Sequence, residues 1–218
     1  AALDSLGPVL PIAERILRET SGPGAPWTIV ESTDPRYRDL TVARTILAAL
    51  TARLAQRPGP LGPALAESVF GDFDAEANVL SGIDLTKTLS GQEYRAQLAK
   101  EQAKLKKLSL EARRRGVSSV LAFEGWDAAG KGGVIRRITG ALEAGDYRVI
   151  PVAAPTEEER RYHYLWRFWR DLPPAGKVVI FDRTWYGRVL VERLEGFAAP
   201  AEWQRAFDEI NDFEAQMV

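Results

Sequence analysis

The sequence predicts an α/β fold in which helices cover both faces of a parallel sheet. Short apolar stretches typical of buried strands alternate with stretches that repeat apolar residues at helical spacing. The strand expected at 117–123 leads directly into a glycine-rich turn and then a helix. This order is found where parallel strands are joined by helices. With 218 residues, 45% of them hydrophobic, the chain can form one sizeable domain, or about one and a half small ones.

The alternation occupies the second half of the chain. It begins with a long, strongly charged helix expected at residues 92–115, whose few apolar residues share one face. Strands and helices then follow each other. In chain order they are a strand at 117–123, a helix at 133–142, a strand at 147–152, a helix at 157–170 and a strand at 177–181.

A shorter group of elements precedes this core. A helix at 12–19, a strand at 27–31 (WTIVE) and a helix at 40–54 form an expected αβα group. The breaker cluster RPGPLGP follows, and no sustained periodicity appears before residue 90. We therefore expect three segments, namely an N-terminal group at 1–57, a linker or arm at 58–88 and the core at 89–218.

Composition restricts the possible partners. The net charge of -1 gives no overall basic field for nonspecific nucleic-acid binding, so any anion site must be local. The absence of cysteine excludes disulfides, thiolate nucleophiles and cysteine metal sites. No apolar run approaches the roughly 18 residues of a membrane span, and residues 1–11 do not have the layout of a signal peptide. We expect a cytoplasmic protein that binds neither nucleic acid nor membrane.

The turn at 125–132 (GWDAAGKG) has the spacing G-x-x-x-x-G-K between an expected strand and an expected helix. Glycines let the backbone N–H groups converge on a phosphate, and the helix dipole adds positive charge. Lys131 can reach the outer phosphoryl oxygens. The alternative is a tight turn with a surface lysine. The remaining candidates for phosphate binding are Ala128, Ala129, Gly130, Gly132, Gly133, Arg136 and Arg137.

One position departs from the usual phosphate loop, because Gly132 stands where a serine or threonine would bind magnesium. Asp127 in the loop and Asp182 at the end of the last strand are hard carboxylates of the kind that Mg²⁺ prefers. Since ligands of parallel sheets bind at the carboxyl ends of the strands, both carboxylates should face one site. A purely structural Asp127, bonded to loop N–H groups, is the alternative.

Arg183 and Arg188 follow Asp182 across a turn and could clamp phosphoryl oxygens with their forked donors. The alternative for each arginine is an ordinary surface ion pair. His163, the only histidine, is interpreted as a packed or surface residue rather than as a phosphorylated intermediate. Direct in-line transfer is therefore the simpler mechanism.

Together these residues resemble the polyphosphate kinase 2 family. FEGWDAAGKGG at 123–133 and FDRTWYGRVLVERLEGF at 181–197 carry the resemblance, and YLWRFWRDLP and EINDFE fit the same pattern within 89–218. The resemblance implies a P-loop kinase-like three-layer sandwich, Mg²⁺ as cofactor and direct phosphoryl transfer between polyphosphate and a nucleotide. The residues that fall on the family's functional positions are Asp127, Lys131, Asp182, Arg183 and Arg188.

The segment WYGRVLVERLEGF, at residues 185–197, is more similar to the family branch that phosphorylates AMP than to the branch that phosphorylates ADP. That branch often contains two fused copies of the domain, and residues 26–50 resemble the closing strand and helix of a first copy. Residues 1–57 are then the remnant of that copy, and the lid and last strands of the second copy would follow Val218. We expect an incomplete kinase domain and a homo-oligomer.

The first hypothesis for function is therefore magnesium-dependent transfer of a phosphoryl group from inorganic polyphosphate to AMP, giving ADP. An ATP-dependent nucleoside monophosphate kinase is the first alternative, because the pattern FEG-x-D-x-x-GK also resembles thymidylate kinases. A noncatalytic module for polyphosphate binding or dimerisation is the second.

Overall fold

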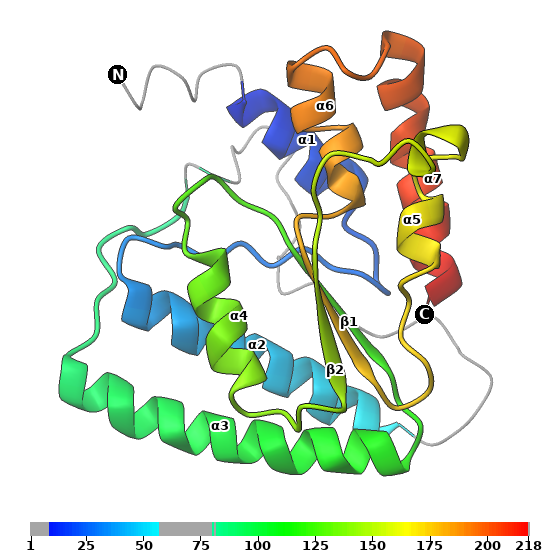
Figure 1. Cartoon of the computed structure of the whole chain (residues 1–218). Coiled ribbons are helices and arrows are strands. Elements are labelled where there is room, and N and C mark those ends of the chain that lie inside the picture. Colours follow the sequence, from blue (N-terminus) through cyan, green and yellow to red (C-terminus); the bar gives the residue numbers. More distant parts are fainter. Residues whose placement is uncertain (1–8, 57–79, 81, 218) are drawn as a thin grey trace. The chain divides into compact units, whose positions relative to one another are not determined.

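The computed structural model describes residues 9–56, 80 and 82–217 (Figure 1). The chain divides into two compact units. Unit 1 contains residues 1–29, 59–83 and 185–218, and unit 2 contains residues 30–58 and 84–184, of which only the described residues are discussed. These units are defined by contacts in space, and each combines separate stretches of the sequence. They therefore do not test the three consecutive segments expected from the sequence, which stay a prediction. Most of the expected linker, 58–88, lies outside the described residues.

Unit 2 contains a three-stranded parallel sheet made of β1 (Ser119–Phe123), β2 (Tyr147–Pro151) and β3 (Val178–Asp182). The strand order is β1-β3-β2, which places β3 in the centre. Phe123 and Pro151 both pair with Asp182, so all three strands end at the same level. The parallel sheet predicted from the alternation of strands and helices is confirmed.

Helices of unit 2 cover both faces of this sheet. On one face Ile180 packs in a cluster with apolar side chains of α2 (Pro35–Ala55), α3 (Gly91–Arg114) and α4 (Lys131–Thr139). On the other face the ring of Phe168, from the short helix α5 (Trp166–Trp169), lies 5.7 Å from the ring of Phe181. Because β3 is buried on both sides, its sequence reads as a continuous apolar run rather than an alternating one.

Capping residues explain where the two long helices begin. The Asp34 carboxylate accepts hydrogen bonds from the N–H groups of Arg36 and Tyr37 at the start of α2. The Ser90 hydroxyl accepts one from the N–H of Glu93 at the start of α3. Such caps satisfy backbone donors that have no partner inside the helix. Both helices were expected, within a few residues of their observed ends.

Two sequence-based predictions of secondary structure are wrong. The helix expected at 157–170 is split into a 3-10 turn, η1 (Glu159–Arg161), and α5, because Tyr162 adopts an extended backbone and its ring stacks on Trp166 at 4.3 Å. The strand expected at 27–31 does not form within the described part of the chain. Trp27 instead donates its indole N–H to the Thr20 hydroxyl, at 2.9 Å.

Unit 1 contains α1 (Leu10–Glu19), the 3-10 turn η2 (Trp185–Arg188), α6 (Val191–Leu194) and α7 (Pro200–Met217). Its centre holds a buried carboxylate. Glu214 accepts hydrogen bonds from the indole N–H of Trp185 at 2.9 Å and from the hydroxyl of Tyr186 at 2.7 Å. Burial raises the pKa of Glu214 to about 7, although the two hydrogen bonds favour the ionised form.

No helix in the described residues is both long enough and apolar enough to cross a lipid bilayer. This statement covers residues 9–56, 80 and 82–217.

Glu214 should make stability depend on pH. Its pKa in the folded state, about 7, exceeds the ordinary value of 4.5, so its contribution is complete below pH 4.5 and is lost as pH rises to about 7. Relative to Glu214→Gln, which cannot titrate, the wild-type free energy of unfolding should fall by on the order of 2–3 kcal/mol across that window. Urea unfolding at several pH values measures the difference. A constant difference between the two proteins would contradict this prediction.

Candidate phosphate-binding site

The loop between β1 and α4 has the backbone of an anion-binding turn. Gly125, Ala128 and Gly130 have positive φ angles of 152°, 65° and 88°. Glycine adopts this region freely, whereas Ala128 occupies it at a cost in strain. Gly130 is the N-cap of α4 and provides no side-chain cap, so the first N–H groups of this helix remain available for a ligand. The strand, turn and helix predicted from the G-x-x-x-x-G-K spacing are thus observed.

Lys131 folds back over this loop. Its ammonium group donates hydrogen bonds to the carbonyl oxygens of Gly125, at 2.7 Å, and Trp126, at 3.1 Å. A lysine ammonium has three donors on a flexible stem and can exchange these carbonyls for the oxygens of a ligand. Lys131 therefore connects its end of the loop to the carbonyls of Gly125 and Trp126 at the other end. It is also placed to neutralise an anion bound there.

A pocket of about 300 Å³ lies at this end of the sheet. Its position follows from the strand register, because the pairing of Phe123 with Asp182 brings the end of β3 beside the start of the loop. The residues that line the pocket are Asp127, Ala128, Gly130, Lys131, Gly132, Asp182 and Arg183, all of them expected site residues.

An ion pair joins the loop to the end of β3. The guanidinium of Arg183 donates to the carboxylate of Asp127, with a distance of 2.7 Å between Nη2 and Oδ1. The Asp127 side chain is 90% exposed. Exposed ion pairs contribute only about 0–1 kcal/mol, so Asp127 can release Arg183 for another cation at little cost.

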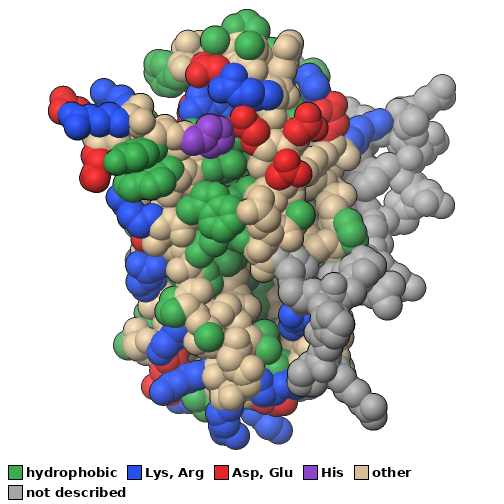
Figure 2. All heavy atoms as spheres, turned by 90° about the vertical axis from the view of Figure 1, so that its right-hand side faces the viewer, with side chains coloured by type: hydrophobic (Ala, Val, Ile, Leu, Met, Phe, Trp, Pro, Cys, Tyr) green, Lys and Arg blue, Asp and Glu red, His purple; other side chains and the backbone are tan. Residues whose placement is uncertain are grey.

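The other expected site residues do not line the pocket. Arg136 is exposed on α4, and Arg137 donates to the Gly133 carbonyl at 2.9 Å and pairs with Asp39. Arg188 belongs to unit 1, where it forms an ion pair with Glu192 at 3.2 Å. Ala129 and Gly133 are also absent from the lining. His163, also outside it, is exposed, and Figure 2 shows this single histidine at the surface.

Sequence reasoning missed Glu124, which directly follows β1. Its carboxylate accepts hydrogen bonds from the N–H of Thr184, at 2.7 Å, and from the hydroxyl of Thr184, at 2.8 Å. Burial raises the pKa of Glu124, while the two hydrogen bonds oppose that rise. Glu124 therefore fixes the turn after Asp182 against the start of the loop. An acidic residue immediately after an apolar strand was the available signal.

The pocket offers two carboxylates to a metal ion, those of Asp127 and Asp182. Carboxylate oxygens are the ligands that Mg²⁺ prefers, and in phosphate sites the metal commonly takes only one or two from the protein. Within the described ranges no group of three or more acidic or histidine side chains forms a metal cluster. The donor set thus fits a magnesium ion shared with phosphate oxygens rather than an all-protein metal site.

Thr184→Val should destabilise the protein while preserving side-chain shape. Thr184 is 3% exposed, and the substitution removes one of the two donors to the buried Glu124 carboxylate. We expect the free energy of unfolding to decrease by about 1–3 kcal/mol. Thr139→Val, which removes a hydroxyl bonded only to the Arg136 carbonyl at 3.2 Å, is the matched control and should change stability by less than about 0.5 kcal/mol. Equal losses in urea unfolding would contradict this role of Thr184.

Comparison with known protein families gives a match to the family described as Polyphosphate kinase 2 (PPK2), over residues 88–218. The polyphosphate:AMP phosphotransferase of Pseudomonas aeruginosa is 52% identical over 204 residues, which are 94% of this chain and 41% of that protein. The ADP-polyphosphate phosphotransferase 3 of Rhizobium meliloti is 40% identical over 146 residues, or 67% of this chain and 51% of that one. The chain thus spans less than half the length of its P. aeruginosa relative.

Solved structures agree. The crystal structure of a candidate polyphosphate kinase 2 from P. aeruginosa has a TM-score of 0.62 and 51% identity, covering 94% of this chain and 41% of that chain. The polyphosphate kinase 2 of Arthrobacter aurescens has a TM-score of 0.60 and 33% identity, covering 63% of this chain and 52% of that chain. The α/β fold expected from the resemblance is therefore confirmed.

Proposed function

Because this chain belongs to the polyphosphate kinase 2 family, we propose that the protein transfers a phosphoryl group from inorganic polyphosphate to AMP, giving ADP. The observation that carries the proposal is that residues of the phosphate loop, among them Lys131 and Asp127, line the same pocket as Asp182. Relatives in the branch named for this reaction, 52% and 47% identical to this chain, support AMP as the acceptor.

The loop and Lys131 bind the donor in this proposal. The open N–H groups at the start of α4 and the helix dipole attract a polyanion. Lys131 exchanges the carbonyls of Gly125 and Trp126 for phosphoryl oxygens. The bond between the terminal phosphorus and its bridging oxygen breaks, a bond from that phosphorus to an oxygen of the AMP phosphate forms, and polyphosphate leaves one unit shorter. Lys131 neutralises the charge on the leaving oxygen.

Arg183 holds the transferring group or the acceptor. Its backbone at a φ of 67° fixes the direction of the side chain beside Asp182, and its guanidinium already lies at the pocket. A forked guanidinium suits the oxygens of a phosphoryl group. Arg188 keeps the same proposed role through the family resemblance. Arg136 and Arg137 are proposed to extend the path of the anion because they lie one turn into the helix that follows the phosphate loop.

Asp127 and Asp182 would hold a magnesium ion. When bound, the ion neutralises phosphate charge and orients the phosphoryl oxygens. Holding the ion would take Asp127 out of its exposed ion pair with Arg183 and would leave that guanidinium free for the substrate. We also propose a cytoplasmic location and a homo-oligomeric assembly.

The donor and acceptor can be tested directly. The protein at its full natural length, mixed with polyphosphate, AMP and Mg²⁺, should form ADP, detected by chromatography. ATP in place of polyphosphate is the second arm. ADP formed from ATP but not from polyphosphate would assign an ordinary nucleoside monophosphate kinase. Binding of polyphosphate without turnover would indicate a noncatalytic module.

Removing either carboxylate should slow transfer. Asp127→Asn and Asp182→Asn should each lower kcat/KM roughly a hundredfold or more, about 3 kcal/mol of transition-state stabilisation. Asp171→Asn is a matched control, because Asp171 lies outside the pocket lining and pairs with Arg148 at 3.3 Å. It should leave the rate within about twofold. Unchanged rates in the two pocket variants would remove both carboxylates from the proposed metal site.

A further inference from the structure

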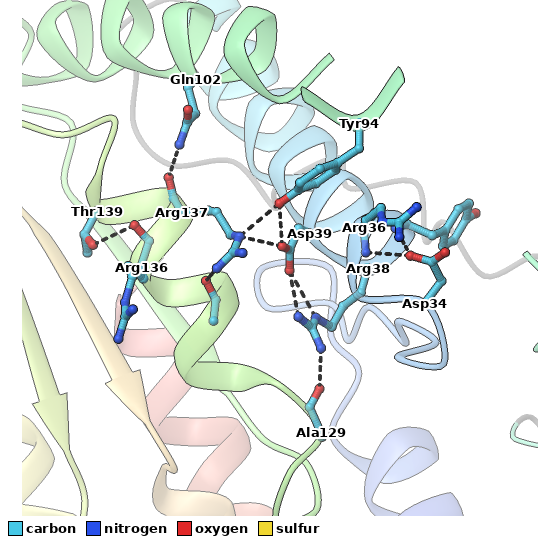
Figure 3. Close-up of polar contacts among 12 residues, drawn as sticks. Asp34, Arg36, Arg38, Asp39, Tyr94, Gln102, Ala129, Arg136, Arg137 and Thr139 are labelled. Atoms are coloured by element: carbon cyan, nitrogen blue, oxygen red, sulfur yellow. Dashed lines mark hydrogen bonds and ion pairs between the residues drawn. The ribbon is translucent and has the colours of Figure 1, made fainter. Parts of the chain in front are cut away.

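A network of charged side chains lies against the phosphate loop on the side of α2 (Figure 3). Arg38, in the first turn of α2, donates from Nη1 to the carbonyl oxygen of Ala129 at 3.2 Å. These two residues are 91 positions apart in the sequence, yet both belong to unit 2. The Arg38 side chain is only 11% exposed, so its guanidinium is held within the structure rather than in solvent.

The loop is shaped around this guanidinium. A Cβ atom built on Gly130 would overlap Nη1 and Cζ of Arg38, and one on Gly133 would lie 3.5 Å from Nη2. Gly130 therefore meets two requirements at once, a positive φ of 88° and space for a side chain from another helix. The second observation is independent of any phosphate and shows that the Arg38 guanidinium lies directly against the loop at Gly130.

Asp39 holds Arg38 in this position. Oδ1 of Asp39 accepts from Nε and Nη2 of Arg38, at 3.1 and 2.9 Å. Its other oxygen, Oδ2, accepts from the Tyr94 hydroxyl at 2.8 Å and pairs with Nε of Arg137 at 2.6 Å. Asp39 is 3% exposed, and a buried carboxylate with these partners keeps a fixed geometry. One carboxylate thus links the loop, through Arg38, to α4, through Arg137.

The bond to Ala129 determines which way the next N–H points. In a planar trans peptide the C=O and the following N–H point in opposite directions. Because Arg38 draws the Ala129 carbonyl toward α2, the N–H of Gly130 points away from α2. Gly130 lines the pocket, whereas Arg38 does not. From this geometry we infer that Arg38 is a positioning residue, which orients the Ala129–Gly130 peptide for phosphate binding without touching the phosphate.

This inference deepens the proposed function and rests on it only for the identity of the anion. It gives α2, from the N-terminal segment of the sequence, a part in the phosphate site of the core. Asp39 pairs with both Arg38 and Arg137, so one carboxylate is shared by two guanidinium groups. The geometric effect of Arg38 is therefore measured on the loop itself, without a bound anion.

The test compares Arg38→Ala with Arg44→Ala in the protein at its full natural length. Arg44 lies on the same helix, with a side chain 55% exposed, and contacts Gln97 and Glu101 of α3 instead of the loop. Hydrogen exchange of the peptide 124–134 is followed by mass spectrometry without substrate. Arg38→Ala should speed exchange of this peptide roughly tenfold and raise KM for polyphosphate by a similar factor, with kcat lowered less. Arg44→Ala should change neither.

Arg38→Lys covers the case in which Arg38→Ala does not fold. It keeps a positive partner for Asp39 but loses the fork that bonds Asp39 and Ala129 together, so loop exchange should be faster than in wild type, and slower than in Arg38→Ala where that variant folds. Loop exchange equal to that of Arg44→Ala, or an equal rise in the peptides of β3 and α3, would overturn the inference.

The result also separates the inference from the proposed function, because loop exchange is measured without substrate. Faster loop exchange in a protein that cannot use polyphosphate would reject only the proposed function. Normal transfer from polyphosphate, together with unchanged loop exchange in Arg38→Lys and Arg38→Ala, would reject only the positioning role.

Discussion

The parallel register of β1 and β3 is the constraint on which the site depends. Pairing of Phe123 with Asp182 makes the two strands end at the same level, so the loop that leaves β1 and the turn that leaves β3 meet. Glu124, at the start of the loop, then holds the turn after β3 in place by accepting two hydrogen bonds from Thr184. A shift of one residue would turn the side chain of Asp182 to the other face of the sheet and separate it from the loop.

Much of this arrangement can be predicted from the sequence, because it is encoded locally. An apolar strand, a glycine-lysine turn and a helix are neighbours along the chain, and the carboxyl-end rule for parallel sheets then places Asp182 beside Lys131. Arg183 follows directly from Asp182. The predictions that were wrong, a strand at 27–31 and an unbroken helix at 157–170, fail because aromatic and hydroxyl contacts of Trp27 and Tyr162 outweigh backbone propensity.

The contacts between α2 and the phosphate loop join residues that are far apart in the sequence, so local sequence patterns do not predict them. Arg38 reaches Ala129 across 91 positions, and nothing in the pattern around Arg38 distinguishes it from Arg36 or Arg44 on the same helix. Arg137 illustrates a second kind of contact that the sequence does not reveal: besides the phosphate contact proposed from its place near the loop, it bonds Asp39, Tyr94 and Gly133. Only packing of α2 and α3 on α4 distinguishes these arginines.

The hydrogen bonds of Lys131 to Gly125 and Trp126 have a consequence for selectivity between anions. Lys131 and Arg183 already spend part of their donors on groups of the protein, so an incoming anion exchanges some existing contacts rather than only adding new ones. A single orthophosphate ion, with few oxygens, recovers little from such an exchange. A chain of linked phosphates can engage several donors at once, so a single orthophosphate ion should compete poorly with such a chain for the pocket.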